Sequence, residues 1–130
     1  MVFSASGTQL VCAGITNVTN AFNLVGNPMI ALFDWASGKV VQQLVPQEVA
    51  KGTMWGVVSH PAGFWVGVVG ASLNEVIKGK LLFWKGDQAA AFHTLKLPEH
   101  ARDLDAHPDG LRLATAHADG ALRIFDMSPM

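Results

Sequence analysis

The stretch HPDGLRLATAHADGALRIFD at residues 107–126 decides the fold that we predict for this chain. It reads as a turn closed by Gly110, a strand of alternating apolar and polar residues, a tight Asp-Gly turn, and a second strand ending on an aromatic residue. The same arrangement occurs at residues 3–34 and 59–85, with turn glycines at positions 7 and 63. One supersecondary unit that recurs after a few tens of residues indicates a repeat architecture.

In each unit the second of these strands ends on an aromatic residue followed by a polar one: Phe33-Asp34, Trp84-Lys85 and Phe125-Asp126. This pattern resembles the WD-repeat β-propeller family, in which the equivalent strand ends in Trp-Asp. The second unit has Lys85 where the family has aspartate. No unit has the family's Gly-His pair before its first strand, so the resemblance implies only part of the family's His–Ser–Asp–Trp hydrogen-bond network.

The resemblance implies an all-β fold, a propeller segment of two and a half to three four-stranded antiparallel blades that form an incomplete ring. We expect a first blade at 1–46 with a truncated first strand, a second at 47–98, and a third at 99–130 without an outer strand. A β-sandwich is the competing fold, but the in-register repeat favours the propeller. The expected strands are Val2–Phe3, Gln9–Ile15, Met29–Asp34, Val40–Val45, Met54–Ser59, Trp65–Val69, Lys80–Trp84, Ala91–Leu97, Arg102–Ala106, Arg112–His117 and Ala121–Asp126.

The amino-acid composition is typical of a protein with buried β-sheets. Apolar residues make up 50% of the 130 positions and charged residues 15%, with a net charge of −1 and no basic cluster. This balance argues against a nucleic-acid partner. No window holds the roughly 20 apolar residues that a membrane-spanning helix needs. We see no signal peptide, and the lone Cys12 cannot form an internal disulfide, so a cytoplasmic location is favoured.

The residues offer little sign of a metal, cofactor or catalytic site. The five histidines are not spaced as zinc ligands, and we expect no metal and no cofactor. His60 and His107 precede a proline in equivalent turns, which is typical of a structural role. A serine, a histidine and an aspartate could be combined on paper into a triad, but there is no nucleophile elbow. We therefore expect no enzyme activity.

Charged residues on the innermost strand of the third unit are the main candidates for a site within the ring. The segment Arg102-Asp103-Leu104-Asp105 would face the central channel or a seam between blades, and Trp55 lies on the innermost strand of the second unit. The alternative is an internal salt bridge or pairing with backbone carbonyls. Trp55, Arg102, Asp103 and Asp105 are thus the channel-lining candidates.

Two insertions predict a binding surface. Relative to the third unit, the first is longer by Thr16–Asn27 and the second by Ala71–Gly79. The resemblance implies that both loops emerge on one face of the ring, and loops with large apolar residues commonly make binding surfaces. Drift in a tolerant loop is the alternative. The candidate partner-binding residues are Asn20, Phe22, Asn23, Leu24, Leu73, Asn74, Glu75 and Ile77.

The expected function is a non-catalytic scaffold for protein–protein interaction. The alternatives are an enzyme with its site at the channel mouth, around Arg102, Asp103 and Asp105, and a structural part-propeller that self-assembles. An arc of about three blades leaves apolar faces open to water. We therefore expect either a homo-oligomer, most simply a dimer, or the remainder of a longer propeller chain to cover these faces.

Overall fold

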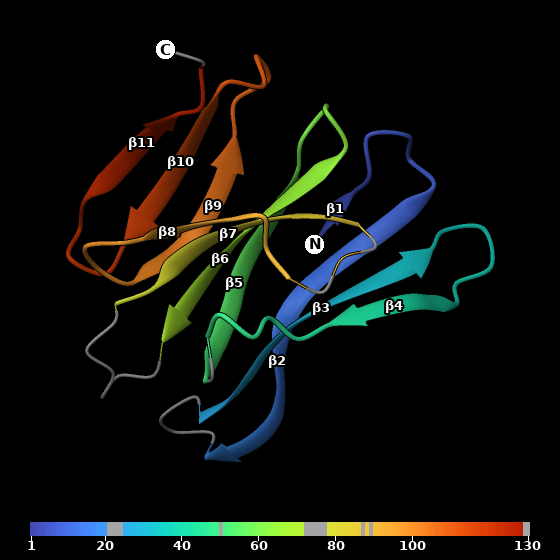
Figure 1. The fold of residues 1–130 in the computed structure, drawn as a ribbon, viewed down its shortest axis with the longest axis horizontal. Helices are drawn as coiled ribbons and strands as arrows, with labels where there is room; N and C mark the ends of the chain where they lie inside the picture. The colour runs from blue at the N-terminus through green and yellow to red at the C-terminus, as the bar shows by residue number, and fades with distance from the viewer. Residues whose placement is uncertain (21–24, 50, 72–77, 87, 89, 129–130) are drawn as a thin grey trace.

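The fold consists of three antiparallel β-sheets, shown in Figure 1 for the computed structural model of the chain. The structure describes residues 1–20, 25–49, 51–71, 78–86, 88 and 90–128. Within these residues there is no helix, and the second sheet lies between the first and the third (Figure 1). The predicted all-β class and the open, propeller-like arrangement are confirmed.

Within each sheet the strands follow chain order. The first sheet contains β1 (Val2–Phe3), β2 (Gln9–Asn20), β3 (Val25–Asp34) and β4 (Val40–Leu44). The second contains β5 (Gly52–Ser59), β6 (Phe64–Ala71), β7 (Lys80–Lys85) and β8 (His93–Lys96). The third contains β9 (Ala101–Ala106), β10 (Arg112–His117) and β11 (Leu122–Asp126). β1 and β9 both pack against β5, so the first strands of the three sheets are neighbours.

The three turns that join the first two strands of each sheet have the same backbone hydrogen bonds. The N–H groups of Gly7, Gly63 and Gly110 donate to the carbonyls of Ser4, His60 and His107, at 2.9, 2.9 and 3.0 Å respectively. The three glycines have φ values of 72°, 90° and 72°, a region that favours glycine. The repeat seen in the sequence is therefore a repeat of turn geometry.

The second sheet is buried on both faces. On β6, Trp65 and Val69 belong to the core shared with the first sheet, whereas Val66 and Val68 belong to the core shared with the third. Side chains alternate between the two faces of a strand, so a nearly continuous apolar run supplies both cores. The run Val66–Val69 is therefore a strand covered on both sides.

The aromatic strand ends occupy equivalent register positions but differ in burial. Phe33 pairs with Leu10, Trp84 with Trp65, and Phe125 with Leu113. Trp84 is buried, but Phe33 and Phe125 are only half-buried. Phe33 lies on the face of the first sheet that points away from the second. Phe125 faces the second sheet, but no fourth strand lies beside it in the described part of the third sheet.

The first insertion is not a loop over its whole length. β2 continues to Asn20 and β3 begins at Val25, so most of Thr16–Asn27 extends the hairpin. Asn20, predicted in a loop, is the last residue of β2 and pairs with Val25. The residues 16–20 include Thr16, Val18 and Thr19, whose β-branched side chains favour an extended backbone. Asn17, with a φ of 52°, interrupts the regular register there.

Candidate functional site

Arg102 and Trp55 are brought together where the second and third sheets meet. Arg102 lies on β9 and Trp55 on β5, and the guanidinium carbon is 4.6 Å from the centroid of the Trp55 ring. Both side chains are half-buried. A Cβ on Gly70 would lie 2.7 Å from Nε1 of Trp55, so the absence of a side chain at this position leaves space for the indole ring. The arrangement is a cation–π contact across the seam between two sheets.

Asp103 and Asp105 lie on the other face of β9 from Arg102. They pair with Ala116 and Ala114 of β10, on the side that points away from the second sheet, and both are exposed. Each carboxylate accepts a hydrogen bond from the next backbone N–H, that of Leu104 and that of Ala106 respectively, at 2.9 Å. The four channel-lining candidates therefore lie in two places. Trp55 and Arg102 are in contact between the second and third sheets, whereas Asp103 and Asp105 lie on the open face of the third sheet.

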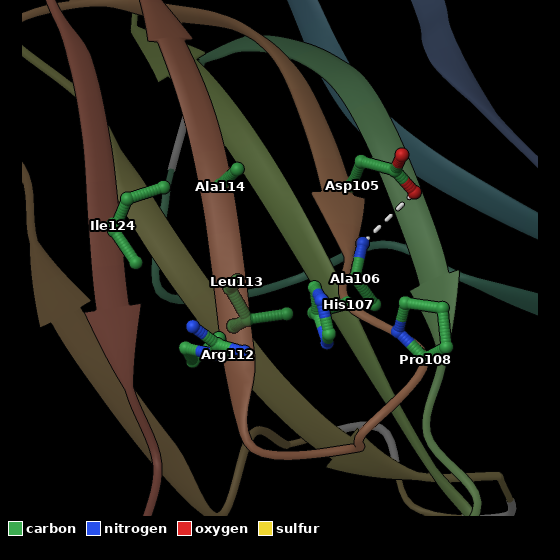
Figure 2. A pocket seen from close by; sticks show the side chains of 8 residues that line it. All are labelled: Asp105, Ala106, His107, Pro108, Arg112, Leu113, Ala114 and Ile124. Carbon is green, nitrogen blue, oxygen red and sulfur yellow. Dashed lines mark hydrogen bonds between the residues drawn. The ribbon is translucent and has the colours of Figure 1, made fainter.

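A shallow hollow of about 290 Å³ lies on this open face of the third sheet (Figure 2). Ala114 has a small side chain, which leaves space between Ile124 on β11 and Asp105 on β9. The dashed line in Figure 2 is the hydrogen bond from the Ala106 N–H to the Asp105 carboxylate. One end of the hollow is closed by the turn that carries His107 and Pro108.

Asp109 organises the turn beside this hollow, which agrees with its position before Gly110 in the sequence. Its carboxylate accepts hydrogen bonds from the Leu111 N–H at 2.8 Å and from Arg112 at 2.8 and 3.0 Å, and it lies 3.0 Å from His107. The Leu111 N–H, followed by Arg112, lowers the pKa of Asp109 to about 2. Arg112, two residues after the turn glycine, lies within reach of this carboxylate.

His117 holds a short buried network in the third sheet. Its Nε2 lies 2.6 Å from the Thr115 hydroxyl, and its Nδ1 lies 2.9 Å from the Glu99 carbonyl. Thr115 and His117 are both buried. The contacts bind β10 to the segment before β9, so this histidine has a structural position.

His100 is the buried titratable group nearest to the Arg102 seam. Its Nδ1 has no hydrogen-bond partner among the described residues. Burial first, and then the positive charge of Arg102, lower the pKa of His100. The Ala118 N–H donates to the His100 carbonyl at 2.7 Å, which fixes the backbone there. Burial and the nearby Arg102 therefore both disfavour the charged form of this side chain.

Two searches of the described part of the chain, for metal-ligand groups and for membrane-spanning helices, gave the following results. No group of three or more His, Cys, Asp or Glu side chains is placed there to hold a metal ion. The same residues contain no helix that is long and apolar enough to cross a bilayer. Cys12 is partly exposed on β2, because it shares a face with Leu10, away from the second sheet.

Most of the predicted partner-binding residues lie outside the described residues. Phe22, Asn23 and Leu24 fall within residues 21–24, and Leu73, Asn74, Glu75 and Ile77 within residues 72–77. The strands that flank these two segments are described: β2 and β3 around the first, and β6 and β7 around the second. Both segments therefore connect the second and third strands of their sheets.

Comparison with solved structures places this geometry in a known fold. The chain is similar to the Dos1 propeller, with a TM-score of 0.62 and 13% sequence identity over 92% of this chain. The similarity covers 28% of that propeller chain. It shows the fold alone: three antiparallel sheets that match part of a β-propeller and do not close into a ring. No protein-family profile and no curated protein sequence matches the chain.

Proposed function

We propose that this chain is part of a WD-repeat-like β-propeller and serves as a non-catalytic scaffold for protein–protein interaction. Large apolar side chains exposed on the two outermost sheet faces carry this proposal. Exposed apolar surface of this kind marks sites of protein association. The repeated strand-end aromatics and the shared turn hydrogen bonds support the WD-repeat assignment.

The open face of the first sheet is aromatic. Phe3, Leu10 and Phe33 pair across β1, β2 and β3, so their side chains share one face, and that face points away from the second sheet. Phe3 is 46% exposed, and Trp35 beside it is 58% exposed. Their rings meet edge to face with centroids 4.9 Å apart. The face offers a rigid apolar surface to a partner.

The open face of the third sheet combines aliphatic and acidic side chains. Leu122 is 69% exposed and Ile124 58% exposed, and Asp103 and Asp105 lie on the same face. The hollow of Figure 2 lies between these groups. In the interior of the molecule, the corresponding faces are each covered by another sheet. We therefore propose that a partner packs on the two open faces, as a neighbouring sheet does on the covered ones.

Self-assembly is the second candidate, favoured by the apolar character of both open faces. Contact between the first sheet of one copy and the third sheet of another would be heterologous, and it closes into a ring only if the rotation fits. Two arcs would give about six sheets, within the usual range of propellers. We propose either such a dimer or the remainder of a longer propeller chain as the partner of these faces.

Light scattering coupled to size-exclusion chromatography tests the assembly proposal. At micromolar concentration we expect a dimer, and Ile124→Asp should shift it towards monomer because the new charge would be buried at the contact. Val18→Asp, at an exposed position of the β2 hairpin, is the matched control and should leave the mass unchanged. A well-folded wild-type monomer would contradict self-assembly and leave the longer chain as the partner.

A further inference from the structure

We propose that the seam between the second and third sheets binds a carboxylate group through hydrogen-bond donors of Arg102, Trp55 and Thr53. The site lies on the first strands of these sheets, β5 and β9, which pack against each other (Figure 1). Both of its walls belong to the described chain, and the inference goes beyond the scaffold function proposed above. The carboxylate comes from an acidic side chain of a bound peptide or from a free carboxylic acid.

Donors from β5 and β9 converge at Gly70 on β6. A Cβ at this position would lie 2.7 Å from Nε1 of Trp55 and 3.7 Å from Nη1 of Arg102. Thr53 is directly opposite Gly70 in the pairing of β5 with β6, so its side chain lies on the same face of the sheet, with the two Cβ positions about 5 Å apart. The hydroxyl, the indole N–H and the guanidinium therefore lie around one point of the seam.

These donors have no acceptor among the described residues. The Thr53 hydroxyl oxygen is buried without a hydrogen-bond partner, and Thr53 as a whole is only 8% exposed. Within the same residues Arg102 forms no ion pair, and its contact with Trp55 is made with the face of the ring. Buried polar groups without a partner are uncommon in folded proteins. A ligand oxygen at this point would satisfy these groups.

The charge around the site matches one carboxylate. His100, two residues before Arg102, is 5% exposed, and its Nδ1 has no partner among the described residues. Burial first, and then Arg102, lower the pKa of His100; Lys78 acts in the same direction and Glu99 against it. With a neutral His100, the cations Arg102 and Lys78 and the anion Glu99 leave one net positive charge. A carboxylate balances this charge, and its two oxygens suit the planar guanidinium.

Sodium acetate, exchanged for sodium chloride at constant ionic strength, is the first probe of the site. In NMR spectra of the nitrogen-labelled protein we expect saturable shifts of the Trp55 Nε1–H and Arg102 Nε–H signals, with Trp55→Phe assigning the indole signal. Arg102→Gln should weaken acetate binding about tenfold or more, because it removes charge-assisted hydrogen bonds. Arg123→Gln is the matched control, since it removes the same charge from the third sheet at a guanidinium paired with Asp119. That control should bind acetate as the wild type does.

Thr53→Val separates binding from stability. The substitution keeps the shape of the side chain and removes a buried hydroxyl that has no partner, so the melting temperature should not fall. Acetate binding should nevertheless weaken about threefold or more, because the carboxylate loses one donor. A hydroxyl that only packs in the core would leave the affinity unchanged.

The tripeptide Ala-Glu-Ala with blocked ends is the second probe, and it identifies the source of the carboxylate. Tighter binding of the peptide than of acetate indicates an acidic side chain, and equal or weaker binding indicates a free carboxylic acid. The proposal is overturned by the absence of saturable shifts, by equal affinities of Arg102→Gln and Arg123→Gln, or by unchanged affinity of Thr53→Val. It is also overturned if Glu75→Gln shifts the Arg102 signal without acetate, because the acceptor would then be a carboxylate of this chain.

Discussion

Nε2 of His60 lies 2.6 Å from the carbonyl oxygen of Gly110, joining the first turn of the second sheet to the first turn of the third. Nδ1 of His60 accepts a hydrogen bond from the Ala62 N–H at 3.0 Å, so the proton is on Nε2 and this nitrogen donates to the carbonyl. The ring also stacks on Phe64, with centroids 4.1 Å apart. His107, at the same position of the third turn, bonds to its own turn through Asp109.

We predict that His60→Ala lowers the free energy of unfolding by about 1 kcal/mol, the usual effect of losing one hydrogen bond between parts of a fold. Urea denaturation followed by tryptophan fluorescence measures it. His107→Ala is the matched control at the equivalent position, and it should cost less because it removes only contacts within one turn. A larger loss for His107→Ala than for His60→Ala would show that the contact between turns does not stabilise the seam.

Gly67→Ala should be destabilising by about 1–3 kcal/mol, the range for forcing an extra methyl into a packed core. A Cβ on Gly67 would lie 2.7 Å from the Trp84 ring and 2.8 Å from the Met54 sulfur. Gly14→Ala is the control, because a Cβ there has no atom within 4 Å. Guanidinium denaturation compares the two variants. Equal stabilities would contradict the packing of Trp84 over Gly67.

Trp84→Ala should cost about 3–5 kcal/mol, as for other large buried side chains. Trp84 is only 3% exposed and belongs to the core between the first and second sheets. Phe33→Ala, at the equivalent register position on an open face, should cost clearly less. Thermal unfolding followed by circular dichroism measures both. A near-neutral Trp84→Ala would place this residue outside the core.

The stability of the third sheet should depend on pH through Asp119. The hydrogen bond from Arg123, followed by that from the Ala121 N–H, lowers the pKa of Asp119 from 3.8 to about 2. A lowered folded-state pKa gives stability that is present above the unfolded value and lost as the pH falls towards the folded one. Asp119→Asn should therefore flatten the fall in melting temperature between about pH 4 and pH 2.

Arg123→Gln should have a similar effect on this pH dependence, because it removes the main cause of the lowered pKa. Both effects should shrink in high salt, since the pair is exposed and screened. An unchanged pH profile in both variants would show that the Asp119–Arg123 pair does not contribute to folding.

The insertion loops remain the predicted surface for a partner that binds the face of the ring. The triple variant Phe22→Ser, Leu73→Ser and Ile77→Ser should weaken binding of a partner isolated with the wild-type protein, because it removes three large apolar side chains. Circular dichroism should show an unchanged fold. Unchanged affinity in the folded variant would remove these loops as the binding surface.

The sequence by itself determined where the strands and turns lie. Turn glycines at positions 7, 63 and 110 and the aromatic strand ends at 33, 84 and 125 were enough to predict three sheets, since turn chemistry and alternation are local properties. The extension of β2 to Asn20 was missed, because pairing of a hairpin beyond its minimal length depends on cross-strand contacts rather than on turn signals.

Only the tertiary structure decided what covers each face. Alternation puts Arg102 and Asp103 on opposite sides of β9, but the packing of β5 against β9 is what places Trp55 under Arg102 and leaves Asp103 and Asp105 on an open face. The same reason separates Trp84 from Phe33 and Phe125, which share its register but not its burial. Burial depends on the neighbouring sheet, and a strand's own sequence does not specify which neighbour it meets.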